Sequence, residues 1–178
     1  MKKLLYGLVI ISFITSCNSL GQKENVESDV PIIIGSAKMD GMDVMTPITI
    51  GETSNQQTWI EYIKAHNDKN LDKIAEINSE DWVAFLPDGS VVEGSKAQRE
   101  ILDNWFKSSN PKWEIQWMIA NAAKNIDDEM EQWLTTGNNF TDIDENGNKI
   151  FEYNVHDIQF VNGKIKKINV YTRAQGQD

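Results

Sequence analysis

The chain has 178 residues, of which 27 are acidic and 17 basic, so its formal net charge is −10. This acidity argues against nucleic acid as a partner and against electrostatic adhesion to anionic lipid head groups, because both require a basic surface. A single cysteine excludes an internal disulfide, and the two histidines, His66 and His156, lie on different predicted elements without ligand spacing, so we expect no transition metal and no cofactor.

The first residues have the layout of a bacterial secretory signal. Lys2 and Lys3 precede an apolar run over residues 4–14, and small residues lead from it to Cys17. The run is shorter than the roughly 20 residues that a helix needs to cross a bilayer. The ending Ile14-Thr-Ser-Cys17 resembles the lipobox of bacterial lipoproteins, in which the cysteine is lipidated and becomes the new N-terminus. An ordinary secretory signal with an incidental cysteine is the alternative.

We predict a signal peptide over residues 1–16, lipidation of Cys17 with acyl chains such as palmitate, and attachment to a membrane of the bacterial cell envelope through this anchor. Asn18 stands where an aspartate is associated with retention in the inner membrane, so the outer membrane is the expected location. Residues 17–52 are interpreted as a lipid-anchored tether followed by an extended arm with one or two short strands.

Residues 53–175 are predicted to form the folded domain, because the apolar periodicity becomes regular there. In the first predicted helix, the side chains at helical spacing that share one face are Trp59, Tyr62, Ile63 and His66. Capping and breaking residues then predict three helices, from Thr53 or Ser54 to Asn67, over residues 71–77, and from a cap at Ser95 to Phe106.

The remaining segments alternate apolar and polar residues with the period of two that is typical of strands. In the strand after the third helix, this alternation places Trp113, Ile115, Trp117 and Ile119 on one face. The strands are predicted over residues 82–86, 90–93, 113–119, 130–140, 150–161 and 164–173. Helices segregated from an antiparallel sheet give an α+β fold.

The predicted turn over residues 142–148 begins with Asp-Ile-Asp-Glu-Asn-Gly, which copies the first half of a calcium loop. The twelfth position, where a bidentate glutamate is required, is Tyr153, and the flanking segments are strands rather than helices. A hairpin turn is the better interpretation, and we predict no metal site.

Several short motifs occur in an order that resembles the nuclear transport factor 2-like superfamily over residues 54–174. They are Tyr62-Ile-Lys-Ala-His-Asn67, Leu71-Asp72, Leu86-Pro-Asp-Gly89, Glu93-Gly94 and Phe160-Val-Asn-Gly-Lys-Ile165. The superfamily includes ketosteroid isomerases and polyketide cyclases of the SnoaL type. The resemblance implies three N-terminal helices packed on a strongly curved antiparallel sheet, a cone-like roll of the cystatin type with a largely apolar pocket inside.

The resemblance also implies which residues face the pocket. Tyr62 and His156 fall where ketosteroid isomerases place a tyrosine and a carboxylic acid that donate hydrogen bonds to a developing oxyanion. In ketosteroid isomerases the general base is an aspartate just before the proline of the first hairpin. In this chain that position is Leu86, which cannot take a proton. We expect Tyr62 and His156 to converge with no carboxylate beside them. The other residues expected to line this pocket are Trp82, Trp105, Trp113 and Trp117.

Each of these residues also has a purely structural interpretation. The Tyr62 hydroxyl can be satisfied by a backbone carbonyl in the core, and His156 can be a buried structural histidine. The tryptophans can be ordinary core residues.

Three functions are therefore considered. The absent base favours a non-catalytic domain that binds a small apolar or amphipathic ligand of unknown identity, and it argues against an enzyme. The second function is an enzyme of the isomerase, polyketide cyclase or dehydratase kind that uses Tyr62 and His156. The third is a dimeric scaffold or interaction module, a homodimer that pairs through the sheet face with Glu131, Trp133 and Thr135.

Overall fold

The computed structural model describes residues 30–144 and 146–174. The predicted signal peptide, the lipidated Cys17 and the tether up to residue 29 lie outside the described residues. Among the residues described, each helix is too short or too polar to span a lipid bilayer.

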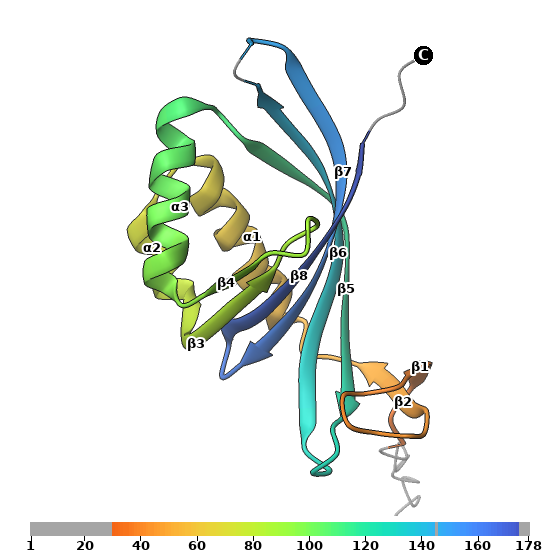
Figure 1. Cartoon of the computed structure of the whole chain (residues 1–178). Coiled ribbons are helices and arrows are strands. Elements are labelled where there is room, and N and C mark those ends of the chain that lie inside the picture. The colour runs from red at the N-terminus through yellow and green to blue at the C-terminus, as the bar shows by residue number, and fades with distance from the viewer. Residues whose placement is uncertain (1–29, 145, 175–178) are drawn as a thin grey trace, which may run out of the picture. The chain divides into compact units, whose positions relative to one another are not determined.

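The described residues form an α+β fold, with three helices and one eight-stranded sheet in the order β1-β2-β5-β6-β7-β8-β3-β4. The helices are α1 (Ser54–Asn67), α2 (Leu71–Ile77) and α3 (Ser95–Ser108). The strands are β1 (Ile33–Ala37), β2 (Thr46–Ile50), β3 (Asn78–Phe85), β4 (Val91–Glu93), β5 (Lys112–Lys124), β6 (Met130–Ile143), β7 (Lys149–Val161) and β8 (Lys164–Ala174). Figure 1 shows all three helices on one side of the long, bent strands β5–β8.

The sheet is mostly, but not entirely, antiparallel, which differs from the expectation from sequence. β3 lies parallel to β8, with Ala84 opposite Ile168, whereas its other neighbour, β4, is antiparallel. Parallel neighbours need a long crossover connection, and here the connection runs through α3 and the three long strands that precede β8. The β3–β4 hairpin therefore forms one end of the sheet (Figure 1).

Residues 33–50, interpreted from the sequence as an arm with short strands, form β1 and β2 at the other end of the sheet. β2 pairs with β5, with Thr49 opposite Ala122. Isoleucine and threonine fit a pleated surface, but the apolar side chains of this arm are only lightly covered. Ile33, for example, is 64% exposed.

One predicted helix cap is in place but makes no side-chain hydrogen bond, and another differs from the structure. Thr53 occupies the N-cap of α1 without a side-chain hydrogen bond, and the N-cap of α3 is Gly94 rather than Ser95. Gly94 has a φ of 81°, a conformation that glycine adopts without steric cost. Its N–H donates to the carbonyl of Trp82 (2.8 Å), so the start of α3 is tied to β3.

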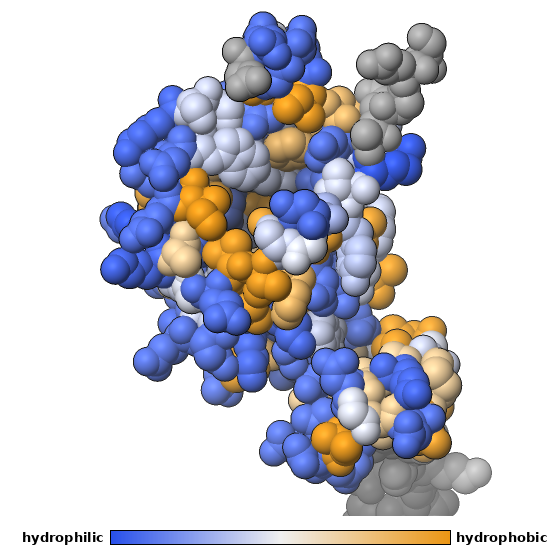
Figure 2. Space-filling view, in the orientation of Figure 1, coloured by the Kyte–Doolittle hydropathy of each residue, from blue (hydrophilic) through white to orange (hydrophobic). Residues whose placement is uncertain are grey.

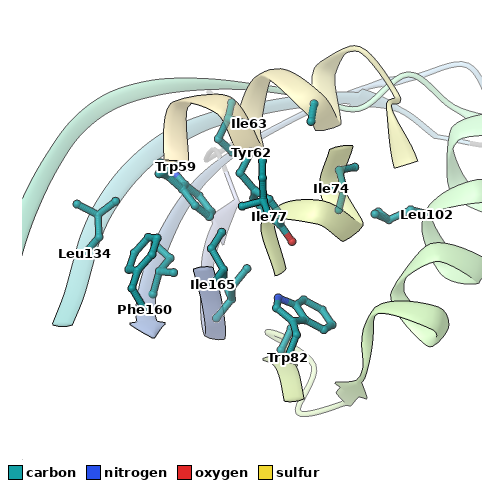
Figure 3. Close-up of a cluster of buried hydrophobic side chains, with 14 of the residues drawn as sticks. Trp59, Tyr62, Ile63, Ile74, Ile77, Trp82, Leu102, Leu134, Phe160 and Ile165 are labelled. Carbon is teal, nitrogen blue, oxygen red and sulfur yellow. The ribbon is translucent and has the colours of Figure 1, made fainter. Parts of the chain in front are cut away.

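One face of α1 packs against the concave side of the sheet. Trp59, Tyr62 and Ile63 are each at most 7% exposed and belong to one apolar cluster (Figure 3). The cluster also contains Ile74 and Ile77 of α2, Trp82 of β3, Leu102 of α3, Leu134 of β6, Phe160 of β7 and Ile165 of β8. Burying a large apolar side chain contributes about 1.5–3 kcal/mol, so this cluster fixes the helices on the sheet.

Strand β5 contains a bulge that its sequence does not reveal. The register with β6 shifts between Ile115 and Trp117, which makes Gln116 an extra residue. The bulge exchanges the faces of the residues that follow it, so Ile115 packs against the core whereas Trp117 is 44% exposed. The Trp117 indole occupies the space over Gly137, where a Cβ atom would lie 2.2 Å from Trp117 Nε1.

Strand β6 continues beyond its predicted end at residue 140 and brings the Asp142 carboxylate to the C-terminal end of α3. The buried carboxylate accepts hydrogen bonds from Trp105 Nε1 (2.9 Å), Ser109 Oγ (3.0 Å) and the backbone N–H of Asn110 (3.0 Å). Three donors, one from the last turn of α3 and two from the residues that follow it, therefore converge on a single acidic side chain.

The neighbouring acid, Asp144, has a separate role in the β6–β7 turn. Its carboxylate accepts hydrogen bonds from the backbone N–H groups of Asn146 (2.9 Å) and Asn148 (2.7 Å). In the described part of the chain, no group of three or more His, Cys, Asp or Glu side chains is arranged to hold a metal ion.

We expect Asp142→Asn to lower the free energy of unfolding by about 2–3 kcal/mol, because an amide offers one oxygen to three donors and turns its own NH₂ group toward them. Urea unfolding followed by tryptophan fluorescence measures the change. Asp103→Asn is the control, since Asp103 is a half-exposed residue of α3 that pairs with Lys107 at the surface. Such surface pairs contribute at most about 1 kcal/mol, and an equal effect of both substitutions would contradict the anchoring role.

Candidate functional site

A cavity of about 350 Å³ lies between helices α1 and α3 and the sheet. Its wall is mainly aromatic and aliphatic. The space-filling view shows the surface hollowed between α3 and the β3–β4 hairpin, with apolar residues around the opening (Figure 2). Six of the seven residues predicted to line a pocket lie in its wall: Tyr62, Trp82, Leu86, Trp105, Trp113 and His156.

The structure places the seventh residue, Trp117, outside the cavity. The prediction counted by two from Trp113 along an uninterrupted strand, and the extra residue at Gln116 breaks this count. Trp117 therefore lies on the opposite face of the sheet from Trp113. Bulges carry no reliable local sequence signature, so periodicity alone could not correct the assignment.

Tyr62 reaches the cavity from α1 with its hydroxyl already engaged. Gln98 Nε2 donates to the hydroxyl (2.6 Å), and Gln98 Oε1 accepts from Asn78 Nδ2 (2.6 Å). Burial raises the pKa of Tyr62, which the hydrogen bonds only partly offset. The Trp82 indole nitrogen points toward the same hydroxyl (Figure 3) but has no hydrogen-bond partner among the described residues. Side chains, rather than the backbone carbonyl considered from the sequence, satisfy this phenol.

His156 reaches the cavity from β7 as a neutral imidazole. Asn138 Nδ2 donates to His156 Nδ1 (3.0 Å), which places the ring proton on Nε2. Burial, with a smaller contribution from the nearby His66, lowers the pKa of His156 to about 3. The Nε2–H group is then the donor that His156 offers to a ligand.

His66 is a second cavity histidine that the sequence analysis did not include in the site. Its Nδ1 lies 2.9 Å from the carbonyl oxygen of Tyr62, one turn earlier in α1, and donates to it. This leaves Nε2 as an acceptor. Burial lowers the pKa of His66 to about 4. The helical spacing with Tyr62 was the available signal, because it put His66 on the buried face of α1.

Tyr62 and His156 do not form the converging pair that was expected. The ring of Trp59 lies against both, with centroid distances of 5.4 Å to Tyr62 and 5.2 Å to His156. Tyr62 instead contacts His66, at 4.4 Å between ring centroids. The Tyr62 hydroxyl accepts a hydrogen bond from Gln98 and so keeps its own O–H as a donor, and Trp59 lies between this phenol and the His156 ring.

Glu152 places a carboxylate in the cavity, contrary to the expectation that none would be there. It lies on β7, and every second residue from it, Asn154 and His156, also lines the cavity. Asn154 accepts from Trp113 Nε1 (3.2 Å) and donates to Glu152 at a long distance of 3.5 Å. Alternation along β7 was a sufficient signal, because two steps of two residues back from His156 reach Asn154 and then Glu152.

Comparison by fold finds relatives where comparison by sequence does not. No family model and no curated protein sequence matches the chain. An epoxide hydrolase of the LEH-like type from Mycobacterium tuberculosis is similar, with a TM-score of 0.57 and 13% identity over 68% of this chain and 84% of that one. SalBIII, an epoxide hydrolase/cyclase-like enzyme of salinomycin pyran ring formation, has a TM-score of 0.52 and 22% identity. The match covers 67% of this chain and 90% of that one. An NTF2-like protein from Burkholderia xenovorans has a TM-score of 0.53 and 12% identity, and the match covers 70% of this chain and 92% of that one.

These low identities make the likeness one of fold. It covers between 67% and 70% of this chain in these three structures. The chain therefore has the fold of nuclear transport factor 2-like (NTF2-like) proteins, the fold that the resemblance of its sequence motifs implied.

Proposed function

We propose that the chain is a membrane-anchored lipoprotein of the bacterial cell envelope whose NTF2-like domain binds a small apolar or amphipathic molecule without transforming it. The observation that carries this proposal is the cavity of about 350 Å³, walled by aromatic and aliphatic side chains around a few polar groups. Pockets for small ligands have this character and begin at a volume of roughly 300 Å³.

The protonation states of the cavity residues support binding rather than acid–base catalysis. With pKa values of about 4 and 3, His66 and His156 are neutral at pH 7 and are weak bases. Leu86 stands in the wall where ketosteroid isomerases carry their base. The raised pKa of Tyr62 keeps its hydroxyl protonated. These groups can orient an oxygen atom of a ligand without exchanging a proton with it.

We expect the full chain to bind prodan, a neutral naphthalene dye, with a blue shift of its emission, because the dye is flat, apolar and small enough for the cavity. Ile101→Trp should weaken binding by about tenfold, since Ile101 lines the opening and is 49% exposed, which leaves room for the indole. Ile60→Trp is the matched control on α1, because Ile60 is 40% exposed and does not line the cavity. Equal affinities of the two variants would contradict binding in this cavity.

The two histidines also predict how stability depends on pH. Their pKa values are lower in the folded chain than the unfolded value of about 6.5, so the unfolded chain binds more protons below that pH. Their contribution is complete above pH 6.5 and is lost as the pH falls toward 4. Lowering the pH from 7 to 5 should therefore reduce the free energy of unfolding by about 2 kcal/mol for each histidine.

Urea unfolding at both pH values measures this loss, and His156→Gln should remove about half of it. The comparison with the variant is needed because the pKa of Asp157 is raised by burial, which contributes with the opposite sign at lower pH. An unchanged loss in His156→Gln would show that this histidine is not buried as a neutral ring.

A second candidate function is an enzyme of the isomerase, polyketide cyclase or dehydratase kind, and Glu152 is the observation in its favour. A carboxylate in an apolar cavity is the group that proton transfer from carbon requires, and Tyr62 and His156 would then orient the substrate. This alternative requires turnover that Glu152→Gln abolishes while ligand binding persists. A panel of ketone and epoxide substrates on which wild type and Glu152→Gln behave alike would leave binding as the function.

The anchor is proposed from the sequence of residues 1–17 and has its own test. In a bacterial host, the full chain should incorporate an alkyne-labelled palmitate and sediment with membranes, because acyl chains bury apolar CH₂ groups in the bilayer. Cys17→Ser should abolish both, whereas Ser19→Ala should change neither. Labelling that persists in Cys17→Ser would contradict the assignment of the anchor.

A further inference from the structure

We infer that the ligand of this cavity carries a positive charge on its apolar body, as an organic ammonium ion held beside Glu152. The inference rests on the proposed binding function and adds to it the sign of the ligand's charge. Three features lead to it: a carboxylate without a cationic partner, an aromatic surface next to that carboxylate, and a cavity wall without lysine or arginine.

Glu152 is the charged side chain of the cavity wall. The residues that line the cavity include no lysine and no arginine. Among the ion pairs of residues 30–144 and 146–174, none includes Glu152. Its side chain is partly buried, and the long contact with Asn154 (3.5 Å) replaces little of the hydration that is lost. A cationic group on a ligand would supply the partner that the protein omits.

The surface beside Glu152 is aromatic. Phe140 stands directly opposite Glu152 in the β6–β7 pair, so the two side chains are neighbours on the cavity face. The Phe140 ring packs against Trp113 (5.0 Å between centroids) and Trp105 (6.0 Å). Both indole N–H groups already donate to other side chains, at 2.9 and 3.2 Å. These indoles therefore have no N–H donor left for an anionic ligand, whereas an aromatic face attracts a cation placed over it.

The same features select against anions. A carboxylate or phosphate on a ligand would meet Glu152 in a wall that offers no compensating positive charge, and the formal net charge of −10 repels anions from the opening. A hydrogen-bond donor is nonetheless present elsewhere in the wall, because His156 accepts from Asn138 at Nδ1 and carries its proton on Nε2. An ammonium ion whose apolar body also carries an ether or carbonyl oxygen would use both groups.

The test uses three probes that share one ring system and differ in charge: 1-naphthylmethylammonium, 1-naphthalenemethanol and 1-naphthoate. Isothermal titration calorimetry at pH 7 and physiological salt measures their affinities for the full chain. We expect the ammonium ion to bind about tenfold more tightly than the neutral alcohol, and the carboxylate to bind least. In Glu152→Gln, the ammonium and the alcohol should bind within about twofold of each other, with the alcohol unchanged.

Glu114→Gln is the matched control, because Glu114 is exposed and lies outside the cavity wall. It removes the same charge and should keep the tenfold preference. Equal affinities of the ammonium and the alcohol for the wild type would overturn the inference while leaving the proposed binding function intact. If none of the three probes binds, the inference and the proposed function both fail. Because the wild-type series alone decides the sign of the preference, the test holds even if Glu152→Gln does not fold.

Discussion

The contact between α1 and the sheet is the interaction on which the rest of the structure depends. Trp59 is 1% exposed, and its ring joins Tyr62 on the helix to His156 on β7. Protein interiors are otherwise packed as densely as organic crystals. Here the wall consists of large, rigid rings held by hydrogen bonds at Tyr62, Trp105 and Trp113, so it cannot collapse into the remaining space. The cavity is therefore a consequence of how the core itself is built.

The low polarity of the cavity decides the protonation states of its polar groups. An imidazole in such a place stays neutral, because the charged form loses its hydration and gains little in return. His66 and His156 each satisfy Nδ1 within the protein, one as donor and one as acceptor. The two histidines thus offer a ligand one acceptor nitrogen and one donor nitrogen, and Glu152 brings negative charge to an otherwise uncharged wall.

Local periodicity was sufficient for much of this architecture. The buried face of α1, the four long strands and the motifs that resemble the superfamily could all be read from residues close together in the chain. The bulge at Gln116 could not, because whether a strand keeps its alternation depends on the partner strand, and this misplaced Trp117. The parallel pairing of β3 with β8 was missed for the same reason.

The candidate site was harder to predict than the fold, because it combines residues from several elements. Periodicity put His66 on the inward face of α1, and the same rule applied to β7 puts Glu152 on an inward face, but it does not show that these faces meet in one cavity. The hydrogen bond from Gln98 to Tyr62 also joins two helices that are distant in sequence, and it decides that the phenol is engaged.

The parallel pair of β3 and β8 has a consequence for how the chain acquires its structure. Val83 is paired with Lys167, far along the polypeptide, and Leu86 and Val92 of the same hairpin region border the cavity opening. Contacts between distant segments are slow to form, because the intervening loop must close before they add stability. The β3–β4 side of the cavity is thus held in its place in the sheet by a strand that is synthesised much later than the hairpin itself.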